Sequence, residues 1–507
     1  MSTLNINVAG ITPHNPPVDI EDQPKSTGRV WSPYQQAIFA HIEDPNGGNA
    51  IVEAVAGSGK STTIKEGLKY ARGSTIFLAF NKAIADELKK AGVNARTFHS
   101  LVFGPVMRAR RQQNPEMNKL RILCQANLTK YEFELYATFM QKLVGLARGM
   151  GIGCLLPNVR GEWFKIVDHH QLEPEHADAD LSRAVDLSME LLDWSCADQR
   201  VDFDDMLYFA VKDKLALQTY DFVFVDEAQD TNPIQRALLR KIMHNRSRLV
   251  AVGDPAQAIY GFRGADSESM GMIAREFNCK TLPLSISYRC PTAVVKYARQ
   301  WVNHIEAAPG AKEGLVGHLG TKWEPSFFRA GDLMVSRKTA PLITTAFKFI
   351  RAGVPVVVMG REIGQGLKAL IKKMKVSDID LLSARLDEYR AREVKLALAK
   401  MDEQKAEAIT DRVECIQFMI DSLAEGYRTI PELETAIDYL FADKGQAVIF
   451  ATIHKSKGLE APRVFWLGRA ECPAKWARMD WQRQQEINLC YVATTRAMEE
   501  LYTLELP

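Results

Sequence analysis

Short apolar runs, each followed by a loop of small or polar residues and then by a helical pattern, recur along the first half of the chain. They occupy 50–52, 75–79, 220–225 and 248–252. Runs whose residues are nearly all apolar, without polar residues at every second position, are typical of strands buried on both faces of a sheet. The alternation of such strands with helices predicts a parallel sheet. A helix over 31–42 precedes the first strand, with Ser32 as its cap and Pro33 at its first position.

A second series of apolar runs in the other half of the chain predicts a second sheet. These runs lie at 334–336, 354–359, 448–452, 464–467 and 501–504. Two long stretches lack strand patterns. Residues 104–199 are helical and carry basic side chains, which form either a solvated face or a contact with DNA, and 368–441 are mixed in charge, as in a solvated helical hairpin.

The predicted fold class is therefore α/β, with two parallel-sheet domains, each interrupted by a helical insertion. We expect a flexible tail before them, because its residues are rich in Asn, Pro and Asp and lack the basic and apolar regions of a secretion signal. The expected boundaries are 1–28 for the tail, 29–103 with 200–280 for the first domain, 104–199 for its insertion, 281–367 with 442–507 for the second domain, and 368–441 for the second insertion.

Composition excludes some classes of protein and leaves others open. The 507 residues are 46% hydrophobic and 25% charged, and no apolar run reaches the length of a membrane helix. A net charge of +2 gives no argument for nucleic-acid binding from bulk charge. The eight cysteines include no C-x-x-C pair, which argues against a zinc ribbon or a disulfide framework and fits a reduced, cytoplasmic protein.

The segment Ala54-Val55-Ala56-Gly57-Ser58-Gly59-Lys60-Ser61 lies between the first predicted strand and a helix. Backbone N–H groups of such a loop surround phosphate oxygens, the lysine reaches the β- and γ-phosphates, and the serine can hold Mg²⁺. Ala54 takes the place of the usual first glycine. An ordinary glycine-rich turn is the alternative interpretation of this segment alone.

Charged and polar residues follow other predicted strands at the edge where open α/β sheets bind ligands. Asp226 can hold Mg²⁺ and Glu227 can orient and deprotonate water. Gln257 follows a later strand, within reach of a γ-phosphate, and Arg289 could place a cation against a transferred phosphoryl group.

Taken in order, these segments resemble the motifs of superfamily 1 helicases of the UvrD/Rep/PcrA type, from about residue 31 to 504. The most specific are Val-Asp-Glu-Ala-Gln-Asp-Thr at 225–231, Gly-Asp-Pro-Ala-Gln-Ala-Ile-Tyr-Gly-Phe-Arg-Gly-Ala at 253–265 and Tyr-Val-Ala-Thr-Thr-Arg-Ala at 491–497. Ala-Phe-Asn-Lys-Ala-Ile-Ala at 79–85 and Thr-Phe-His-Ser at 97–100 are similar to the F-box DNA helicase branch and its phage relatives. The resemblance implies two RecA-like P-loop domains that face each other across one ATP.

The resemblance also implies roles for single residues. Gln35 would read the adenine edge, Tyr288 would stack on the base, Glu460 would contact the ribose, and Gln257 would sense the γ-phosphate. The catalytic residues would be Lys60, Asp226, Glu227, Gln257, Arg289 and Arg496. ATP would lie against Gln35, Ala56, Gly57, Ser58, Gly59, Lys60, Ser61, Thr62, Tyr288 and Glu460, with Mg²⁺ held by Ser61 and Asp226.

On the nucleic-acid side, the resemblance implies a single strand of DNA lying across both domains. The implied contacts are Phe80, Asn81, Thr97, His99, Tyr260, Phe262 and His454. Taken singly, a histidine or an aromatic residue in such a loop is more often part of the core. Family members often have Trp where Phe262 stands and Gly where Val55 stands, so we expect weaker stacking at 262.

These observations together predict an ATP-dependent DNA helicase that moves on single-stranded DNA and unwinds duplexes, with a 3′-to-5′ direction implied by the resemblance alone. The expected partners are single-stranded DNA, single-strand/duplex junctions, and single-strand-binding, replication or recombination proteins. We expect a functional monomer that does not associate with a membrane and that acts on DNA in the cytoplasm of a bacterial or phage-infected cell. A translocase that strips proteins from DNA, an RNA helicase and a non-unwinding P-loop scaffold remain alternatives.

Overall fold

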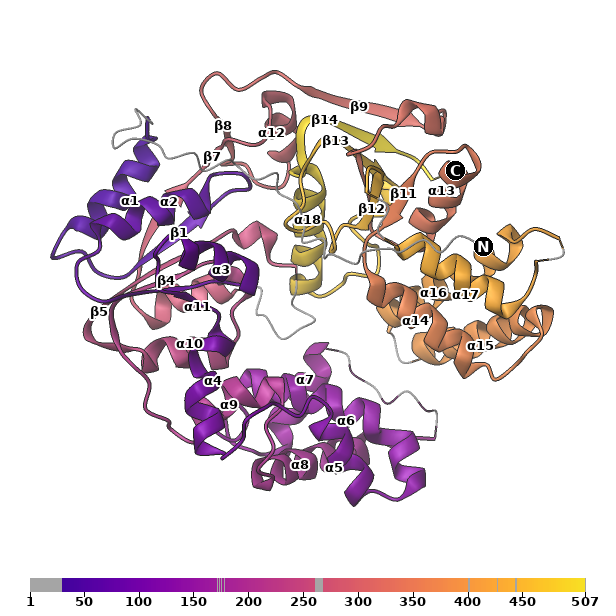
Figure 1. Cartoon of the computed structure of the whole chain (residues 1–507), viewed down its shortest axis with the longest axis horizontal. Coiled ribbons are helices and arrows are strands. Elements are labelled where there is room, and N and C mark those ends of the chain that lie inside the picture. The colour runs from indigo at the N-terminus through magenta and orange to yellow at the C-terminus, as the bar shows by residue number, and fades with distance from the viewer. Residues whose placement is uncertain are drawn as a thin grey trace, which may run out of the picture.

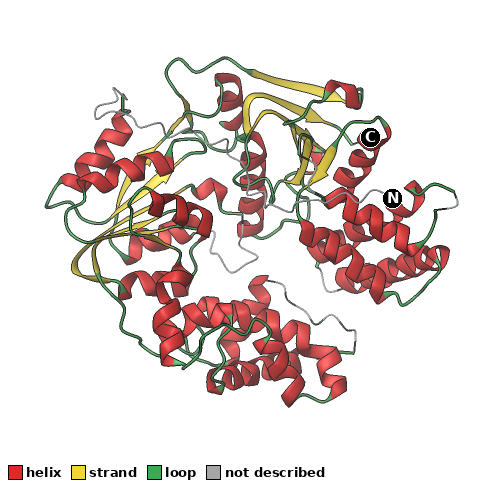
Figure 2. Ribbon diagram, viewed as in Figure 1, coloured by secondary structure: helices red, strands yellow, loops and turns green. Residues whose placement is uncertain are grey.

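The computed structural model describes residues 30–506 apart from 171, 173, 175, 177, 260–267, 400–401, 426 and 443–444. It contains two six-stranded sheets, each with a helical insertion (Figures 1 and 2). We call the part around the first sheet lobe 1 and the part around the second sheet lobe 2. The expected N-terminal tail and the two aromatic residues Tyr260 and Phe262 lie outside the described residues.

Lobe 1 is built on a parallel sheet with the strand order β3-β2-β4-β5-β1-β6. Its central strands are the predicted apolar runs, and they are almost wholly buried. Because all pairs are parallel, the loops that follow these strands gather at one edge of the sheet. The strands are β1 Ala50–Ala54, β2 Thr75–Leu78, β3 Ala95–Arg96, β4 Tyr220–Val225, β5 Met243–Gly253 and β6 Lys280–Leu284.

Strand β6 corrects the expected boundary between the lobes. We expected the second domain to begin at residue 281, but β6 pairs in parallel with β1, with Ala54 opposite Leu284. The backbone N–H of Val55 also donates to the carbonyl of Leu284 at 3.0 Å. The chain therefore leaves the first sheet after Leu284, only five residues before Arg289.

Helices cover the first sheet and place its loops. The Ser32 cap and Pro33 at the first position of α1 are confirmed, with Gln35 completing a capping box. The helix after the phosphate loop begins at Lys60, as the sequence pattern predicts. The helices of lobe 1 are α1 Pro33–Glu43, α2 Lys60–Gly67, α3 Lys82–Lys90, α10 Pro233–Lys241 and α11 Ser269–Glu276.

The first insertion is a helical bundle whose core is continuous with that of lobe 1. The basic residues of this insertion were predicted to form either a solvated face or a contact with DNA. Two of them instead form ion pairs within the bundle. Lys119 is fully buried and pairs with Asp205 at 2.6 Å, and Arg110 pairs with Asp213 at 2.9 Å. The helices are α4 Phe98–Ala109, α5 Lys119–Asn127, α6 Lys130–Met150, α7 Arg160–His170, α8 Leu181–Ala197 and α9 Phe203–Lys212.

Lobe 2 holds a second parallel sheet with the order β11-β12-β10-β13-β14-β9. Helix α18 lies between the two lobes in Figure 1, where it faces the loops of lobe 1. A separate pair, β7 with β8, lies near the crossing between the lobes. The elements are β7 Ile286–Ser287, β8 Glu306–Ala307, β9 Leu315–Gly320, β10 Leu333–Ser336, β11 Val356–Val358, β12 Val448–Thr452, β13 Ala461–Leu467, β14 Ala497–Leu504, α12 Thr292–Ala298, α13 Ala340–Arg351 and α18 Asp480–Thr494.

The second insertion packs on lobe 2 as part of one hydrophobic core. Ile416 and Ile437 of the insertion belong to the same buried cluster as Phe349 and Phe450 of lobe 2. Asp411 of the insertion accepts hydrogen bonds from the first backbone N–H groups at α13, at 3.0 and 2.7 Å. The helices are α14 Arg361–Lys373, α15 Ile379–Ala399, α16 Glu403–Ser422 and α17 Ile430–Phe441. Among the described residues, no helix combines the length and apolarity that crossing a membrane requires.

Candidate active site and nucleic-acid groove

The predicted phosphate loop lies between β1 and α2, at the carboxyl edge of the first sheet. Gly57 and Gly59 have φ angles of +70° and +77°, in the left-handed region that glycine adopts readily. A side chain on Gly57 would also collide with lobe 2, since its Cβ would lie 2.4 Å from the Cβ of Arg289. The N–H of Tyr288 donates to the carbonyl of Gly57 at 2.8 Å. The glycine thus permits a close approach of the segment that carries Tyr288 and Arg289.

Lys60 lies within a cluster of carboxylates at the head of the loop. Its Nζ is 3.5 Å from Oε1 of Glu227. Burial alone would lower the pKa of Lys60, but the charges of Glu227, Asp254 and Asp226 outweigh burial and raise it. Burial likewise opposes ionisation of Glu227, yet Lys60 and Lys457 hold its pKa low, at about 2. Lys60 and Glu227 therefore form a charged pair at neutral pH.

Two arginines of lobe 2 lie close to the same site. Nε of Arg289 pairs with Oε2 of Glu460 at 2.6 Å. Arg496 is fully buried, and its NH2 donates to Oε1 of Gln257 at 3.3 Å. Burial and the neighbouring Arg289 lower the pKa of Arg496 to about 10. The structure thus brings together the two predicted arginines, the predicted sensor glutamine and the predicted ribose contact.

Two of the residues expected to bind the adenosine, Gln35 and Tyr288, lie beside the loop and the start of α2. Gln35 is buried, and its side-chain amide donates to the hydroxyl of Thr63 at 2.9 Å. Tyr288 exposes half of its side chain, so its ring is open to a flat ligand. The fold therefore leaves an aromatic face and an amide near the loop, which suit a purine base.

The donors at the head of the loop fit a magnesium ion bound with a triphosphate. Asp226 is 5% exposed, and burial together with the charge of Glu227 raises its pKa to about 6. A divalent cation beside this carboxylate would favour its ionised form. Ser61 is exposed at the start of α2, and the buried hydroxyl of Ser58 has no hydrogen-bond partner. One carboxylate, one hydroxyl, water and phosphate oxygens form a typical Mg²⁺ ligand set.

Three further residues, which the sequence analysis missed, tie lobe 2 to the nucleotide loops of lobe 1. The hydroxyl of Tyr491 accepts from the N–H of Ala56 at 2.8 Å. The side-chain amide of Asn488 donates to the carbonyl of Ala258 at 2.9 Å. Lys457 contacts Asp230 at 2.7 Å and the carbonyl of Gln257 at 2.9 Å. The sequence signal for two of them was their spacing. Asn488 and Tyr491 are three residues apart on one helix, so their side chains share a face and can contact the same neighbour.

A groove of about 930 Å³ runs along the carboxyl edge of the first sheet and reaches Asp226 and Glu227. Phe80 lines it with 49% of its side chain exposed, after β2. Asn81 and Thr97 line it too, although their side-chain oxygens also cap α3 and α4. His99 lies deeper, and burial lowers its pKa to about 4. The four described residues of this lobe that were predicted to contact DNA therefore share one groove.

Phe203 is a groove residue that the sequence analysis missed. Its ring stacks on that of His99, with centroids 3.8 Å apart and planes at 19°. Phe203 is 46% exposed, so it presents an aromatic face to the groove. The large apolar residue at the first position of α9 was the only local signal.

His454, from lobe 2, follows β12 and is partly buried.

A phosphate loop at the edge of one parallel sheet, faced by charged side chains of a second, defines a two-lobed protein of the P-loop class. Comparison with known families gives the particular one. The family model of the UvrD/REP helicase N-terminal domain matches residues 31–278, and that of the UvrD-like helicase C-terminal domain matches 214–505. The chain belongs to the UvrD/Rep/PcrA-type superfamily 1 helicases.

Individual relatives agree with this family. F-box DNA helicase 1 of Gallus gallus is 29% identical over 252 residues, covering 46% of this chain and 24% of the relative. F-box DNA helicase protein 1 of Schizosaccharomyces pombe is 27% identical over 319 residues, covering 56% and 33%. ATP-dependent DNA helicase UvrD2 of Mycobacterium tuberculosis is 27% identical over 360 residues, covering 59% and 51%. The chain thus spans between a quarter and a half of the length of these relatives.

Proposed function

We propose that the protein is an ATP-dependent DNA helicase that hydrolyses ATP between its two lobes and moves along single-stranded DNA in the 3′-to-5′ direction. The observation that carries the proposal is that both lobes supply charged groups to one site. Lys60 and Glu227 come from lobe 1, and Arg289 and Arg496 come from lobe 2. The direction of movement rests on the family alone.

The proposed chemistry follows from the charges at the site. A triphosphate would draw Lys60 away from Glu227, which would leave an ionised carboxylate free to orient and deprotonate a water molecule. Arg289 and Arg496 would stabilise the negative charge that develops on the transferred phosphoryl group. Bound Mg²⁺, held by Ser61 and Asp226, would neutralise phosphate charge.

The lobes would convert hydrolysis into movement because their separation alters the site. ATP would bind the closed arrangement more tightly, since only that arrangement supplies all four charged residues, and loss of the γ-phosphate would remove this preference. Phe80, His99 and Phe203 would hold bases of the single strand in the groove by stacking and packing. Because the groove reaches Asp226 and Glu227, strand binding and hydrolysis can influence each other.

ATP turnover with and without oligo-dT tests the proposal. Lys60→Ala should abolish DNA-stimulated turnover, because it removes the cation that holds the β- and γ-phosphates. Arg289→Ala should lower kcat by about a thousandfold and change ATP binding little, since such an arginine acts mainly on the transition state. Lys65→Ala is the matched control, because Lys65 lies on the same helix, is partly exposed and pairs with Glu87 away from the site.

Strand displacement on tailed duplexes then separates a helicase from its alternatives. Displacement from a 3′-tailed but not a 5′-tailed duplex supports the proposed direction. Normal turnover in Lys60→Ala, or turnover that DNA does not stimulate, would contradict the proposal and favour a nucleotide-binding scaffold. Equal stimulation by RNA would contradict the choice of DNA.

A further inference from the structure

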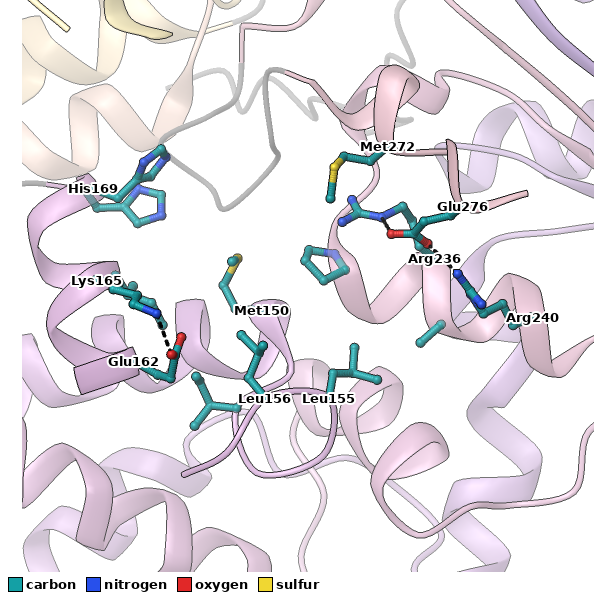
Figure 3. A pocket seen from close by; sticks show the side chains of 15 residues that line it. Met150, Leu155, Leu156, Glu162, Lys165, His169, Arg236, Arg240, Met272 and Glu276 are labelled. Atoms are coloured by element: carbon teal, nitrogen blue, oxygen red, sulfur yellow. Dashed lines mark hydrogen bonds and ion pairs between the residues drawn. The ribbon is translucent and has the colours of Figure 1, made fainter. Parts of the chain in front are cut away.

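A cavity of about 750 Å³ lies between lobe 1 and its helical insertion, apart from the nucleotide site and the groove (Figure 3). Helices α10 and α11 form its wall in lobe 1. The end of α6, the loop after it and α7 form the opposite wall. This volume lies within the range typical of small-molecule sites. Among the residues that the structure describes, none of the proposed ATP or DNA contacts lines it.

The wall on the side of the insertion is mainly apolar. Met150, Leu155, Leu156 and Ile166 line it, and Met272 faces them from α11. His169 lies at the rim, where its ring stacks on that of Trp481 of lobe 2, with centroids 4.9 Å apart. The cavity thus offers an apolar surface large enough for a ring system, near a contact with lobe 2.

The opposite wall carries an excess of positive charge around one carboxylate. Glu276 accepts from Nε of Arg236 at 3.2 Å and from NH2 of Arg240 at 3.4 Å, so two cations share one anion. At the insertion, Lys165 and Glu162 pair at 2.6 Å and neutralise each other. Among the described residues that line the cavity, the charged side chains therefore sum to one excess positive charge.

Arg236 is the member of this group that lacks a partner for one of its nitrogens. The residue is 4% exposed, and its buried NH1 makes no hydrogen bond. Figure 3 shows its guanidinium directed toward the apolar wall on the far side of the cavity. A buried donor without an acceptor costs free energy, and an anionic group bound beside it would supply the acceptor.

We propose that this cavity is a second ligand site, which takes a small amphipathic anion. The apolar body of the ligand packs against the wall formed by Met150, Leu156 and Ile166, and its carboxylate, sulfonate or phosphate accepts from Arg236. The site goes beyond ATP hydrolysis and DNA binding and depends on neither. The cavity and the groove both border helix α10. Residues at the start of this helix line the groove, whereas Arg236 and Arg240 line the cavity.

Two fluorescent probes of similar shape test the site in the full-length protein without ATP or DNA. They are 1-anilinonaphthalene-8-sulfonate, which is anionic, and N-phenyl-1-naphthylamine, which lacks the sulfonate. The wild type should bind one anionic probe per chain, about tenfold more tightly than the neutral probe, because of the charge-assisted bond to Arg236. Arg236→Met should remove this preference and leave the affinity for the neutral probe unchanged.

Three further variants keep the test decisive. Ala237→Trp should lower the affinity for both probes by at least about tenfold, because the indole would fill the cavity. Arg236→Gln should behave like Arg236→Met and serves if the latter is unstable. Arg246→Met should change neither affinity, because Arg246 lies on β5 outside the cavity and is exposed.

Two results would overturn the proposal. Unchanged binding of both probes to Ala237→Trp would place the dyes elsewhere on the protein. A preference for the anionic probe that survives in both Arg236 variants would show that Arg236 receives no anion. DNA-stimulated ATP turnover of each variant is measured separately, so failure of the proposed helicase activity leaves the binding result interpretable.

Discussion

Lys60 and Glu227 neutralise each other in a partly buried site, and a triphosphate would have to compete with this pair. The low pKa of Glu227 keeps it ionised throughout the physiological range. Removing its charge should therefore free Lys60 for phosphate while removing the proposed general base. Glu227→Gln should bind ATP at least as tightly as the wild type and lose at least about a hundredfold in kcat.

Nucleotide binding by a fluorescent ATP analogue and single-turnover hydrolysis check this expectation separately. Glu66→Gln is a suitable control, because Glu66 lies on α2 and pairs with Lys69 away from the site. A Glu227→Gln variant that hydrolyses ATP at the wild-type rate would assign water activation to another group.

The stacked pair of Phe203 and His99 should contribute to the affinity for single-stranded DNA. Phe203→Ala should weaken single-strand binding by about fivefold to a hundredfold, because stacking of one base contributes about 1–3 kcal/mol. The salt dependence of binding should stay the same, since no phosphate contact is lost. Fluorescence anisotropy with labelled oligo-dT over a range of salt measures both. Tyr131→Ala, an exposed aromatic of the first insertion, is the control.

His99 should contribute no charge to DNA binding at neutral pH. Its pKa is lowered to about 4 by burial, so it is neutral above that value and gains a proton only as the pH falls toward 4. Between pH 5.5 and 7.5, the affinities of the wild type and of His99→Asn should change in parallel with pH. A step in the wild-type profile near pH 6.5, absent from His99→Asn, would contradict this expectation.

Helix α18 is the element that connects both nucleotide loops of lobe 1 to lobe 2. Tyr491 contacts the phosphate loop, and Asn488 contacts the loop that carries Gln257. Tyr491→Phe would leave the N–H of Ala56 without its acceptor and weaken this connection. We expect DNA-stimulated kcat to fall by about three- to tenfold, with a smaller change in the KM for ATP.

Steady-state kinetics with and without oligo-dT measure this effect, and Tyr502→Phe is the matched control. The hydroxyl of Tyr502 donates to Glu500 within lobe 2, away from the nucleotide loops. Equal losses in basal and DNA-stimulated turnover would indicate that the Tyr491 hydroxyl only supports the fold.

Elements with strong local patterns could be predicted from the sequence. The buried runs of β1, β2, β4 and β5 and the Ser32 cap of α1 each carry their signal within a few residues. The partner of β6 could not be predicted in this way, because Lys280–Leu284 gives the same apolar pattern in either sheet. Phe203 and Tyr491 were missed for the same reason, since their contacts join residues more than one hundred positions apart.

At the scale of the whole molecule, the second insertion and lobe 2 share one core, so they should unfold together. Ile416 is fully buried in that core. Ile416→Ala should destabilise lobe 2 by about 2–5 kcal/mol, the usual range for truncating a large buried aliphatic side chain. Leu398→Ala, at a half-exposed position of α15, should cost far less.

Urea unfolding followed by tryptophan fluorescence reports this stability in a background where Trp31, Trp163 and Trp194, which lie outside lobe 2, are replaced by Phe. Trp323 then reports on the shared core, in which it is buried. The midpoint should shift in Ile416→Ala even though the substitution lies in the insertion. A transition of lobe 2 that is unaffected by Ile416→Ala would show that the insertion unfolds independently.

The crossing from the first sheet to the second begins after Leu284, and Arg289 lies five residues further along the chain. The segment that would bend when the lobes change their angle is consequently the segment that carries the arginine. Rotation of one lobe would then displace the guanidinium directly, because Arg289 lies within the connecting segment itself. If Arg289 contacts the γ-phosphate as proposed, the segment that connects the lobes would itself respond to the loss of that phosphate.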